Sequence, residues 1–331
     1  FIGATNDNVD QILAADYSKI PGIKLFVGSS TGNMLVNSPE ALVKLFAGFS
    51  GVIAVHAEDE AVIKANREWL MKEYGEKVPI ALHSLLRSRE ACVKASKLVV
   101  DLARKHNSRL HLLHISTADE LRLLSPSPIE EKRITAETCP HYLIFTASDL
   151  LENRGFTRKC NPAIKGEGDR NALRKAVADG LIDIVATDHA PHLLTEKQGT
   201  LFTAASGMPG VKFMLPLMLS IADENGLSLE KIVEKVSHNP AKLYSIDRRG
   251  FIRPGFYADL TLVDHLEAPH TITDGDAATA GAPDAGCDWT PYLGLTTRYA
   301  VRSTWVNGKL VYDSEHIITS NRNPLPLTFN H

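Results

Sequence analysis

A regular alternation of short apolar runs with longer segments of helical periodicity is the feature that most constrains the fold of this chain. The alternation extends from residue 1 to about residue 245. The apolar runs lie at residues 1–5, 23–27, 52–56, 110–115, 134–138 and 182–187. Amphipathic stretches lie between them, for example at residues 39–49, 89–106 and 169–179. Strands that alternate with helices in this way predict parallel βαβ units and an α/β fold.

The last part of the chain has a different pattern. Two short strand-like runs, at residues 301–306 and 309–312, flank Asn307-Gly308, which is a strong signal for a β-hairpin. Residues 267–286 are rich in Ala, Gly, Asp and Pro, so we expect a surface loop there. The sequence therefore predicts an α/β part at residues 1–245 and a small β subdomain at residues 246–331.

Composition and charge argue against several classes of protein. The net charge of −3 and the lack of a dense basic stretch are not typical of nucleic-acid binding. No apolar run is long enough to cross a bilayer, and no signal peptide opens the chain. The four cysteines are scattered without a CxxC motif, which fits a reducing compartment. We therefore expect a cytoplasmic protein whose partner is neither a membrane nor a nucleic acid.

Chemically active side chains occur in or at the ends of several strand-like runs. Lys24 lies within the second run, His56 ends the third, His114 lies near the end of the fourth and Asp188 follows the sixth. Any one of them has an ordinary structural explanation, such as a hydrogen-bonded core histidine or an aspartate at a helix N-cap. Carboxyl ends of parallel barrel strands converge on one mouth, however, so four such residues together predict a site rich in nitrogen and oxygen ligands.

The motifs around these residues resemble the amidohydrolase superfamily. The resemblance begins with Lys24, His56-Ala57-Glu58 and His114-Ile115-Ser116-Thr117. Two further motifs are similar to the cyclic-amide branch, which includes dihydroorotase, hydantoinase and allantoinase: Glu137-Thr138-Cys139-Pro140-His141-Tyr142 and Thr187-Asp188-His189-Ala190-Pro191-His192. Within that branch, dihydroorotases are the most similar in Lys159-Cys160-Asn161-Pro162-Ala163-Ile164-Lys165 and Ser206-Gly207-Met208-Pro209-Gly210.

The resemblance implies a TIM-like (β/α)8 barrel of the metal-dependent hydrolase type, with a small β-sandwich subdomain. The run at residues 1–5 would then be the third barrel strand, so strands 1 and 2 would precede Phe1. In the family the first strand carries a His-x-His pair that completes one metal site, and an Arg for the substrate carboxylate follows shortly after it. An Asn that contacts the substrate follows the second strand. The partner strands of the β-sandwich would also precede the barrel.

The resemblance also implies roles for individual residues. Lys24 would be carbamylated and would bridge two divalent metal ions, most often Zn²⁺. His56 and His114 would bind one of these ions, and Asp188 would bind the other. His111 and His189 are interpreted as structural. The implied substrate contacts come from Asn161, His192, Pro209 and Gly210.

The reaction that the resemblance implies is the reversible cyclisation of N-carbamoyl-L-aspartate to L-dihydroorotate, a step of pyrimidine biosynthesis. In the hydrolytic direction a hydroxide held by the two metals would attack the ring carbonyl. Asp188 would take the proton of the water and return it to the leaving nitrogen, acting first as a general base and then as a general acid.

Two alternatives remain open at the level of the sequence. One is a hydantoinase, dihydropyrimidinase or allantoinase, which acts on another cyclic amide. The other is a dihydroorotase-like scaffold without catalytic activity that associates with aspartate transcarbamoylase. Such a scaffold would be expected to lose metal ligands, whereas Lys24, His56, His114 and Asp188 are all present. A homodimer is the common assembly among relatives of this kind.

Overall fold

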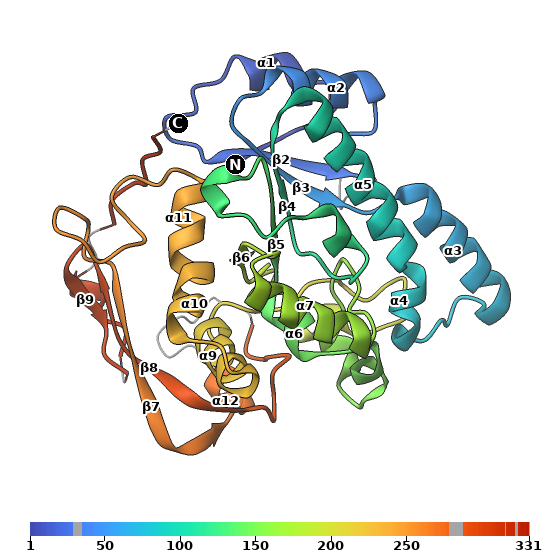
Figure 1. Cartoon of the computed structure of the whole chain (residues 1–331). Helices are drawn as coiled ribbons and strands as arrows, with labels where there is room; N and C mark the ends of the chain where they lie inside the picture. The colour runs from blue at the N-terminus through green and yellow to red at the C-terminus, as the bar shows by residue number, and fades with distance from the viewer. Residues whose placement is uncertain (29–34, 278–286, 315, 322–323, 331) are drawn as a thin grey trace.

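A six-stranded parallel sheet organises the larger part of the computed structural model (Figure 1). The structure describes residues 1–28, 35–277, 287–314, 316–321 and 324–330. The strands follow one another in the sheet in chain order, which is the neighbour order of a (β/α) barrel. The predicted α/β class is therefore confirmed. The strands are β1 (Ile2–Gly3), β2 (Gly22–Val27), β3 (Val52–Ala57), β4 (Arg109–Leu112), β5 (Ile134–Thr138) and β6 (Ile184–Val185).

Most residues in the strands of this sheet are buried. All six residues of β3 are buried, including His56. Near-continuous burial is expected of a parallel strand that lies between two layers of structure. The β2–β3 ladder places Lys24 beside Ala54 and Phe26 beside His56. The chemically active residues of neighbouring strands are therefore held in register by the backbone.

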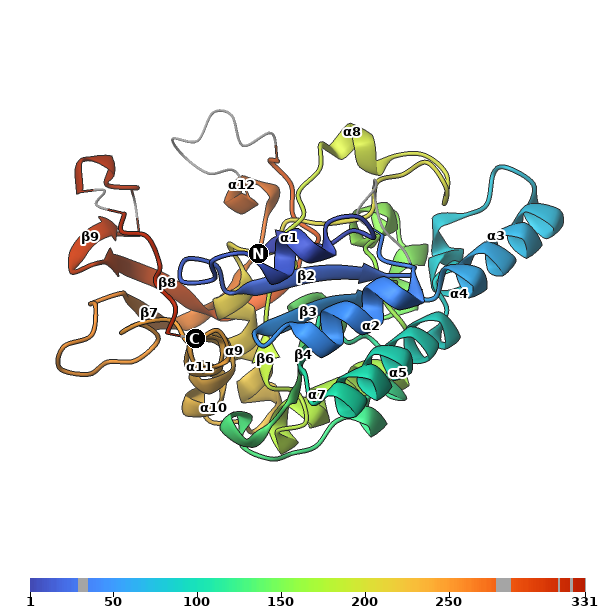
Figure 2. The ribbon, with the colours of Figure 1, turned by 90° about the horizontal axis from the view of Figure 1, so that it is seen from above.

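Helices follow the strands and pack outside the sheet, where α2, α3 and α5 form one flank (Figure 2). Ser38 and Ser88 cap α2 and α5 by accepting hydrogen bonds from Ala41 N–H and Ala91 N–H. Asn107 ends α5 in the left-handed conformation, which Asn tolerates well. The helices of the α/β part are α1 (Val9–Leu13), α2 (Pro39–Gly48), α3 (Glu60–Tyr74), α4 (His83–Leu86), α5 (Arg89–His106), α6 (Pro140–Ile144), α7 (Glu167–Asp179), α8 (Leu194–Lys197), α9 (Met214–Asn225), α10 (Leu229–Val233) and α11 (Asn239–Leu243).

The second sheet is antiparallel and consists of β7 (Leu260–Thr271), β8 (Thr296–Val306) and β9 (Lys309–Tyr312). It lies beyond α9, α10 and α11, away from α3 and α5 (Figures 1 and 2). The predicted hairpin at Asn307-Gly308 is confirmed, and both residues have positive φ, as such a turn requires. The two sheets fall on either side of residue 245, while the exact domain boundary stays a prediction.

The loop predicted at residues 267–286 is wrong in its first part. β7 continues to Thr271, and a short helix, α12 (Asp274–Ala277), follows it. The ladder between β7 and β8 has an irregularity between His265 and His270, and β7 is an edge strand. Pro269 is tolerated in the strand because irregular and edge positions do not need its missing N–H. Residues 278–286 lie outside the described part of the chain.

Three predicted strands, β1, β4 and β6, are shorter than expected, and the last two end before a candidate site residue. β4 ends at Leu112, two residues before His114, and β6 ends at Val185, three residues before Asp188. Both of these residues have positive φ, 40° for His114 and 45° for Asp188. Among the described residues, no helix has the length and apolar character needed to cross a membrane.

Candidate active site

The carboxyl ends of β2, β3, β4 and β6 bring the four candidate metal ligands towards one centre. Lys24 lies in β2, His56 in β3, His114 just beyond β4 and Asp188 just beyond β6. Their charges act on one another: Lys24 and His56 both influence the pKa of Asp188 and that of His114. Residues that are up to 164 positions apart in the chain (Lys24 to Asp188) therefore share one electrostatic environment.

His56 and His114 form the most sharply defined contact of the centre. Nδ1 of His56 lies 2.9 Å from Nε2 of His114, and both rings are buried. Nδ1 of His114 has no hydrogen-bond partner among the described residues. Burial, followed by the charges of His56 and Lys24, holds the pKa of His114 well below its ordinary value. His114 is therefore a neutral imidazole at neutral pH, which is the form that binds metals.

Lys24 projects into the centre without a hydrogen bond or an ion pair to any residue that the structure describes. Its Nζ lies 4.6 Å from the centroid of the Phe26 ring. Burial lowers the pKa of Lys24 to about 8, although the negative charges of Asp188 and Glu137 act in the opposite direction. A half-buried lysine in such a position has a substantial neutral fraction, which is the nucleophilic form of the amine.

Asp188 lies at the open end of the sheet and is exposed. The surrounding protein nevertheless removes part of its hydration, and this burial raises the pKa of Asp188, partly offset by Lys24. The left-handed backbone conformations of His114 and Asp188 are uncommon for residues other than glycine. Such strain is concentrated at functional sites, where the surrounding fold supports it.

Two carboxylates at the centre were not assigned a role from the sequence. Glu137 in β5 lies 3.0 Å from Nε2 of His111, whose Nδ1 lies 2.8 Å from Thr135 Oγ1. This pairing fits the structural interpretation of His111. Glu58 is fully buried and contacts His56 and Arg87. Burial alone would raise the pKa of Glu58, but Arg87 and His56 lower it to about 2. The sequence signal for Glu58 was its position two residues after His56.

The candidate substrate residues lie in loops that follow β5 and β6. Asn161 Oδ1 is buried and has no hydrogen-bond partner among the described residues. His192 is half-buried, with Nε2 3.2 Å from the carbonyl oxygen of Ser206. Gly210 N–H donates to Nδ1 of His189 over 3.0 Å, and Pro209 precedes it. His189 therefore holds the backbone of this loop, in keeping with its structural interpretation.

Lys197 ties the two substrate loops together, a role that the sequence did not indicate. Its side chain is buried, and Nζ donates to the carbonyl oxygens of Lys159, Ala205 and Gly207 at 2.7, 3.0 and 2.7 Å. Gly207 N–H also donates to the Lys159 carbonyl. One ammonium group thus fixes the segment before Asn161 against the segment before Pro209.

The donor types at the centre fit a divalent metal ion. Two imidazoles with adjacent nitrogens and a nearby carboxylate are typical ligands of Zn²⁺. In the described part of the chain, no three His, Cys, Asp or Glu side chains are already arranged to hold a metal. Nε2 of His114 faces Nδ1 of His56, and Nδ1 of His114 has no hydrogen-bond partner among the described residues.

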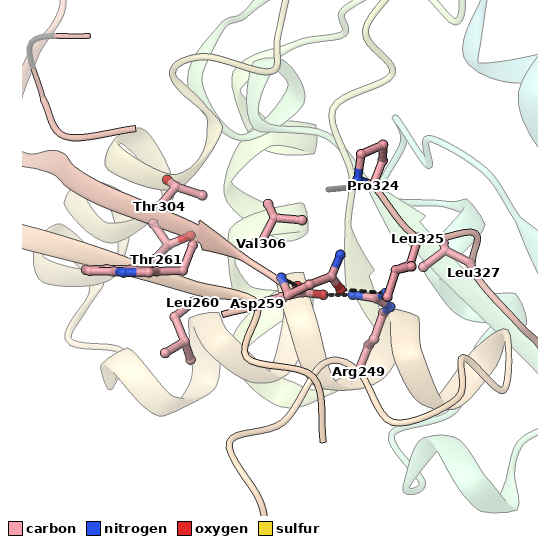
Figure 3. A pocket seen from close by; sticks show the side chains of 11 residues that line it. Arg249, Asp259, Leu260, Thr261, Thr304, Val306, Pro324, Leu325 and Leu327 are labelled. Carbon is pink, nitrogen blue, oxygen red and sulfur yellow. Dashed lines mark hydrogen bonds and ion pairs between the residues drawn. The ribbon is translucent and has the colours of Figure 1, made fainter. Parts of the chain in front are cut away.

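A cavity of about 400 Å³ lies elsewhere, between the start of β7, the end of β8 and the segment at residues 324–327 (Figure 3). None of the candidate site residues lines it. Arg249 crosses the cavity and is paired with Asp259 and Asn307. Because its charged group is already satisfied, the cavity offers no reactive centre comparable to the one around His56.

A family model for the amidohydrolase family matches residues 41–311, which is most of the chain. The chain belongs to the amidohydrolase family. Amidohydrolases generally depend on metal ions, and the relatives of this chain include cyclic amidohydrolases. The match includes His56, His114 and Asp188, while Lys24 lies before its first residue.

Several named amidohydrolases are similar to this chain over most of its length. A dihydroorotase of Geobacter metallireducens is 32% identical over 86% of this chain and 64% of its own length. An allantoinase of Streptomyces avermitilis is 32% identical over 93% of this chain and 67% of its own length. The solved structure of an L-hydantoinase (dihydropyrimidinase) from Arthrobacter aurescens has a TM-score of 0.86 and 25% identity, over 96% of this chain and 70% of that one.

The chain spans less than two thirds of the length of several curated relatives. The shares are 64%, 63% and 58% for the dihydroorotases of Geobacter metallireducens, Pyrococcus furiosus and Methanosarcina acetivorans. The relatives have three different names, so the comparisons do not select one substrate.

Proposed function

We propose that this chain belongs to a dihydroorotase, which interconverts N-carbamoyl-L-aspartate and L-dihydroorotate. The observation that carries the proposal is the convergence of Lys24, within β2, with His56, His114 and Asp188, at the carboxyl ends of β3, β4 and β6. Cyclic-amide hydrolysis needs an activated water and a group that transfers a proton, and this set of side chains provides ligands and a carboxylate for those tasks. Several dihydroorotases at about 32% identity support this substrate.

The proposed site holds two divalent metal ions, most simply Zn²⁺, with Lys24 as a carbamate. The amine of Lys24 would add to carbon dioxide and release one proton, which converts a cationic side chain into an anionic one. This change of charge would explain why Lys24 lies at the centre without an ion-pair partner among the described residues. His56 and His114 would hold one ion through nitrogen, and Asp188 would bind the other through oxygen.

The metal ions, when bound, would polarise the ring carbonyl and lower the pKa of water. Asp188 is placed to move the proton, because it is exposed at the mouth of the sheet while its neighbours Lys24 and His56 are partly or fully buried. In the hydrolytic direction its carboxylate accepts a proton from the attacking water. The C–N bond of the ring then breaks, and Asp188 returns the proton to the departing nitrogen.

Asn161 and His192 would bind the polar groups of the substrate. The buried, unpartnered Oδ1 of Asn161 can accept a hydrogen bond from a ring N–H. The half-buried ring of His192 can face a carboxylate. The backbone beside Pro209 and Gly210, held by His189 and Lys197, would form the remaining wall.

A direct comparison of substrates tests the proposal. Purified protein prepared with zinc and bicarbonate would be assayed with dihydroorotate, hydantoin, dihydrouracil and allantoin under one set of conditions. We expect kcat/KM for dihydroorotate to exceed the others by at least about 100-fold, because a site that pairs with a substrate carboxylate rejects analogues that lack it. A preference for hydantoin, dihydrouracil or allantoin would identify the chain as the corresponding relative instead.

A scaffold for aspartate transcarbamoylase is the second candidate function. The presence of Lys24, His56, His114 and Asp188 in one centre argues against a chain that has lost its ligands. Zinc content and activity separate the two ideas. A folded protein that binds no zinc, shows no turnover of any of the four cyclic amides and co-elutes with aspartate transcarbamoylase would favour the scaffold. Homodimer formation and a cytoplasmic location also remain proposals.

A further inference from the structure

Glu58 is the most completely buried carboxylate beside the proposed metal centre. Its side chain is 0% exposed, and Oε2 is shared between two partners. One is Nε2 of His56, at 3.1 Å, and the other is Nη1 of Arg87. Oε1 has no hydrogen-bond partner among the described residues. A single carboxylate oxygen therefore links a ring that faces the centre to a cation that lies behind it.

The backbone holds Glu58 in this position from two sides. Glu58 N–H donates to the carbonyl oxygen of Val27 at the end of β2, and Asp59 N–H donates to the carbonyl oxygen of Ala91 in α5. Gly28 approaches so closely that a Cβ there would lie 1.8 Å from the Glu58 carbonyl oxygen. These contacts leave the side chain little freedom to move away from His56.

Stability alone is a weak reason for such a buried pair. Removing two charges from water costs several kcal/mol, and replacing a buried ion pair by apolar residues is often neutral or stabilising. In the part of the chain that the structure describes, Oε1 of Glu58 also lacks a hydrogen bond, which adds to the cost. The contact that an apolar replacement could not reproduce is the one between Glu58 and the ring of His56.

That contact determines which nitrogen of His56 carries the hydrogen. A carboxylate paired with a guanidinium is ionised and can only accept hydrogen bonds. Nε2 of His56 must therefore be an N–H donor, and in the neutral ring Nδ1 then carries the lone pair. Nδ1 is the atom that lies 2.9 Å from Nε2 of His114, at the centre of the proposed site.

We propose that Glu58, held by Arg87, is a positioning residue that keeps His56 in the Nε2–H tautomer and presents Nδ1 to the metal centre. This inference rests on the proposed function, because the tautomer of His56 matters only if His56 binds a metal ion through Nδ1. Carboxylates that accept from the far nitrogen of a metal-binding histidine raise the basicity of the ring and fix its orientation.

The test measures the tautomer of His56 directly, by ¹⁵N NMR of histidine-labelled, metal-free protein. The signals of His56 are assigned by their loss in a His56→Gln variant. In the wild type we expect a protonated Nε2 and an unprotonated Nδ1. Glu58→Gln keeps the size of the side chain, but its amide can donate as well as accept. Glu58→Leu combined with Arg87→Met removes both charges, so that no buried cation is left alone.

In the folded double variant we expect both neutral tautomers of His56 to be populated. We also expect the dissociation constant for zinc, measured by competition with a chelator, to rise about 10- to 100-fold. Glu58→Gln should give a smaller change of the same sign. Glu137→Gln is the matched control, because it alters a similar carboxylate–histidine pair at His111 and should leave the His56 signals unchanged.

Two results would overturn the inference. One is an unchanged single tautomer of His56 in the folded double variant. The other is a zinc dissociation constant within about twofold of the wild type, well below the effect expected from losing a hydrogen-bond partner of a metal ligand. Neither measurement uses turnover. If the wild type fails to convert dihydroorotate but the tautomer responds to Glu58, the proposed substrate is wrong while the positioning role stands.

Discussion

Nδ1 of His56 and Nε2 of His114 lie 2.9 Å apart, although 58 positions separate the two residues in the chain. The contact exists because β3 and β4 are neighbours in a parallel sheet and both rings lie at its carboxyl end. Two lone pairs cannot face each other at this distance without a proton or a metal between them. The pair is therefore a natural point at which to test the proposed centre.

Loss of a proposed ligand should lower zinc binding. We expect His114→Ala, and separately Lys24→Ala, to reduce the zinc content of protein purified with zinc and bicarbonate, because each removes a donor from the same centre. Metal analysis of the purified variants measures the effect. His265→Ala is a suitable control, since His265 packs against Tyr299 in the antiparallel sheet. Zinc content equal to that of the wild type in His114→Ala would exclude His114 as a ligand.

Asp188→Asn should abolish most of the turnover while the protein stays folded. The amide has the shape of the carboxylate but cannot accept a proton, and general acid–base groups typically contribute about 10²- to 10⁴-fold to the rate. Because Asp188 is exposed, we expect little change in the thermal midpoint. Asp179→Asn, a change in a surface pair on α7, should leave both quantities as in the wild type. Nearly normal kcat in Asp188→Asn would remove this residue from the proton transfer.

Lys197→Met should lower stability and weaken substrate binding more than it slows the chemical step. The substitution leaves three backbone carbonyl groups without their shared donor, and we expect a loss of roughly 3 kcal/mol in the free energy of unfolding. The loops that carry Asn161 and Pro209 would then be held less firmly, so KM should rise more than kcat falls. Denaturant titration and steady-state kinetics measure the two effects.

The control for this experiment is Lys175→Met, because Lys175 is 75% exposed and forms a surface pair with Asp179. Surface pairs of this type contribute about 1 kcal/mol or less. If Lys197→Met were no more destabilising than Lys175→Met, the three carbonyl contacts would not be important for the fold.

His83 should make the protein less stable in mildly acidic solution. It is buried, and its Nδ1 has no hydrogen-bond partner among the described residues. Burial, followed by the charges of Lys159 and Arg87, holds the pKa of His83 well below 6.5. The unfolded state therefore binds one more proton than the folded state as the pH falls below 6.5, and stability decreases by up to about 1.4 kcal/mol per pH unit from this residue.

A His83→Gln variant should show a shallower loss of stability between pH 6.5 and pH 5. The comparison uses the free energy of unfolding from denaturant titrations of both proteins in the same buffers, so that contributions from other histidines largely cancel. Above pH 7.5 both folded and unfolded His83 are neutral, and the difference between the two proteins should not depend on pH. Parallel curves below pH 6.5 would contradict the assignment of a depressed pKa to His83.

The sequence by itself determined the class of fold and the order of its elements. Alternating apolar runs and amphipathic segments predicted the parallel strands because burial on both faces demands continuous apolar stretches, and β5 and α5 have the predicted bounds. The Asn-Gly pair predicted the hairpin because few other residues adopt positive φ easily. The same reasoning failed at residues 267–271, where pairing with β8 outweighs a composition that is typical of a loop.

Only the tertiary structure decided how the side chains of the site act on one another. A position at the end of a strand indicates at which edge of the sheet a residue lies. It does not indicate that Nδ1 of His56 is the atom directed at His114. The roles of Glu58 and Lys197 depend on Arg87 and on backbone carbonyls that come from other segments of the chain. The sequence places Glu58 two residues after His56 but does not indicate its partner Arg87 or the carbonyl groups around Lys197. Such contacts are set by packing between distant segments, because hydrogen bonds and desolvation depend on which atoms meet in space.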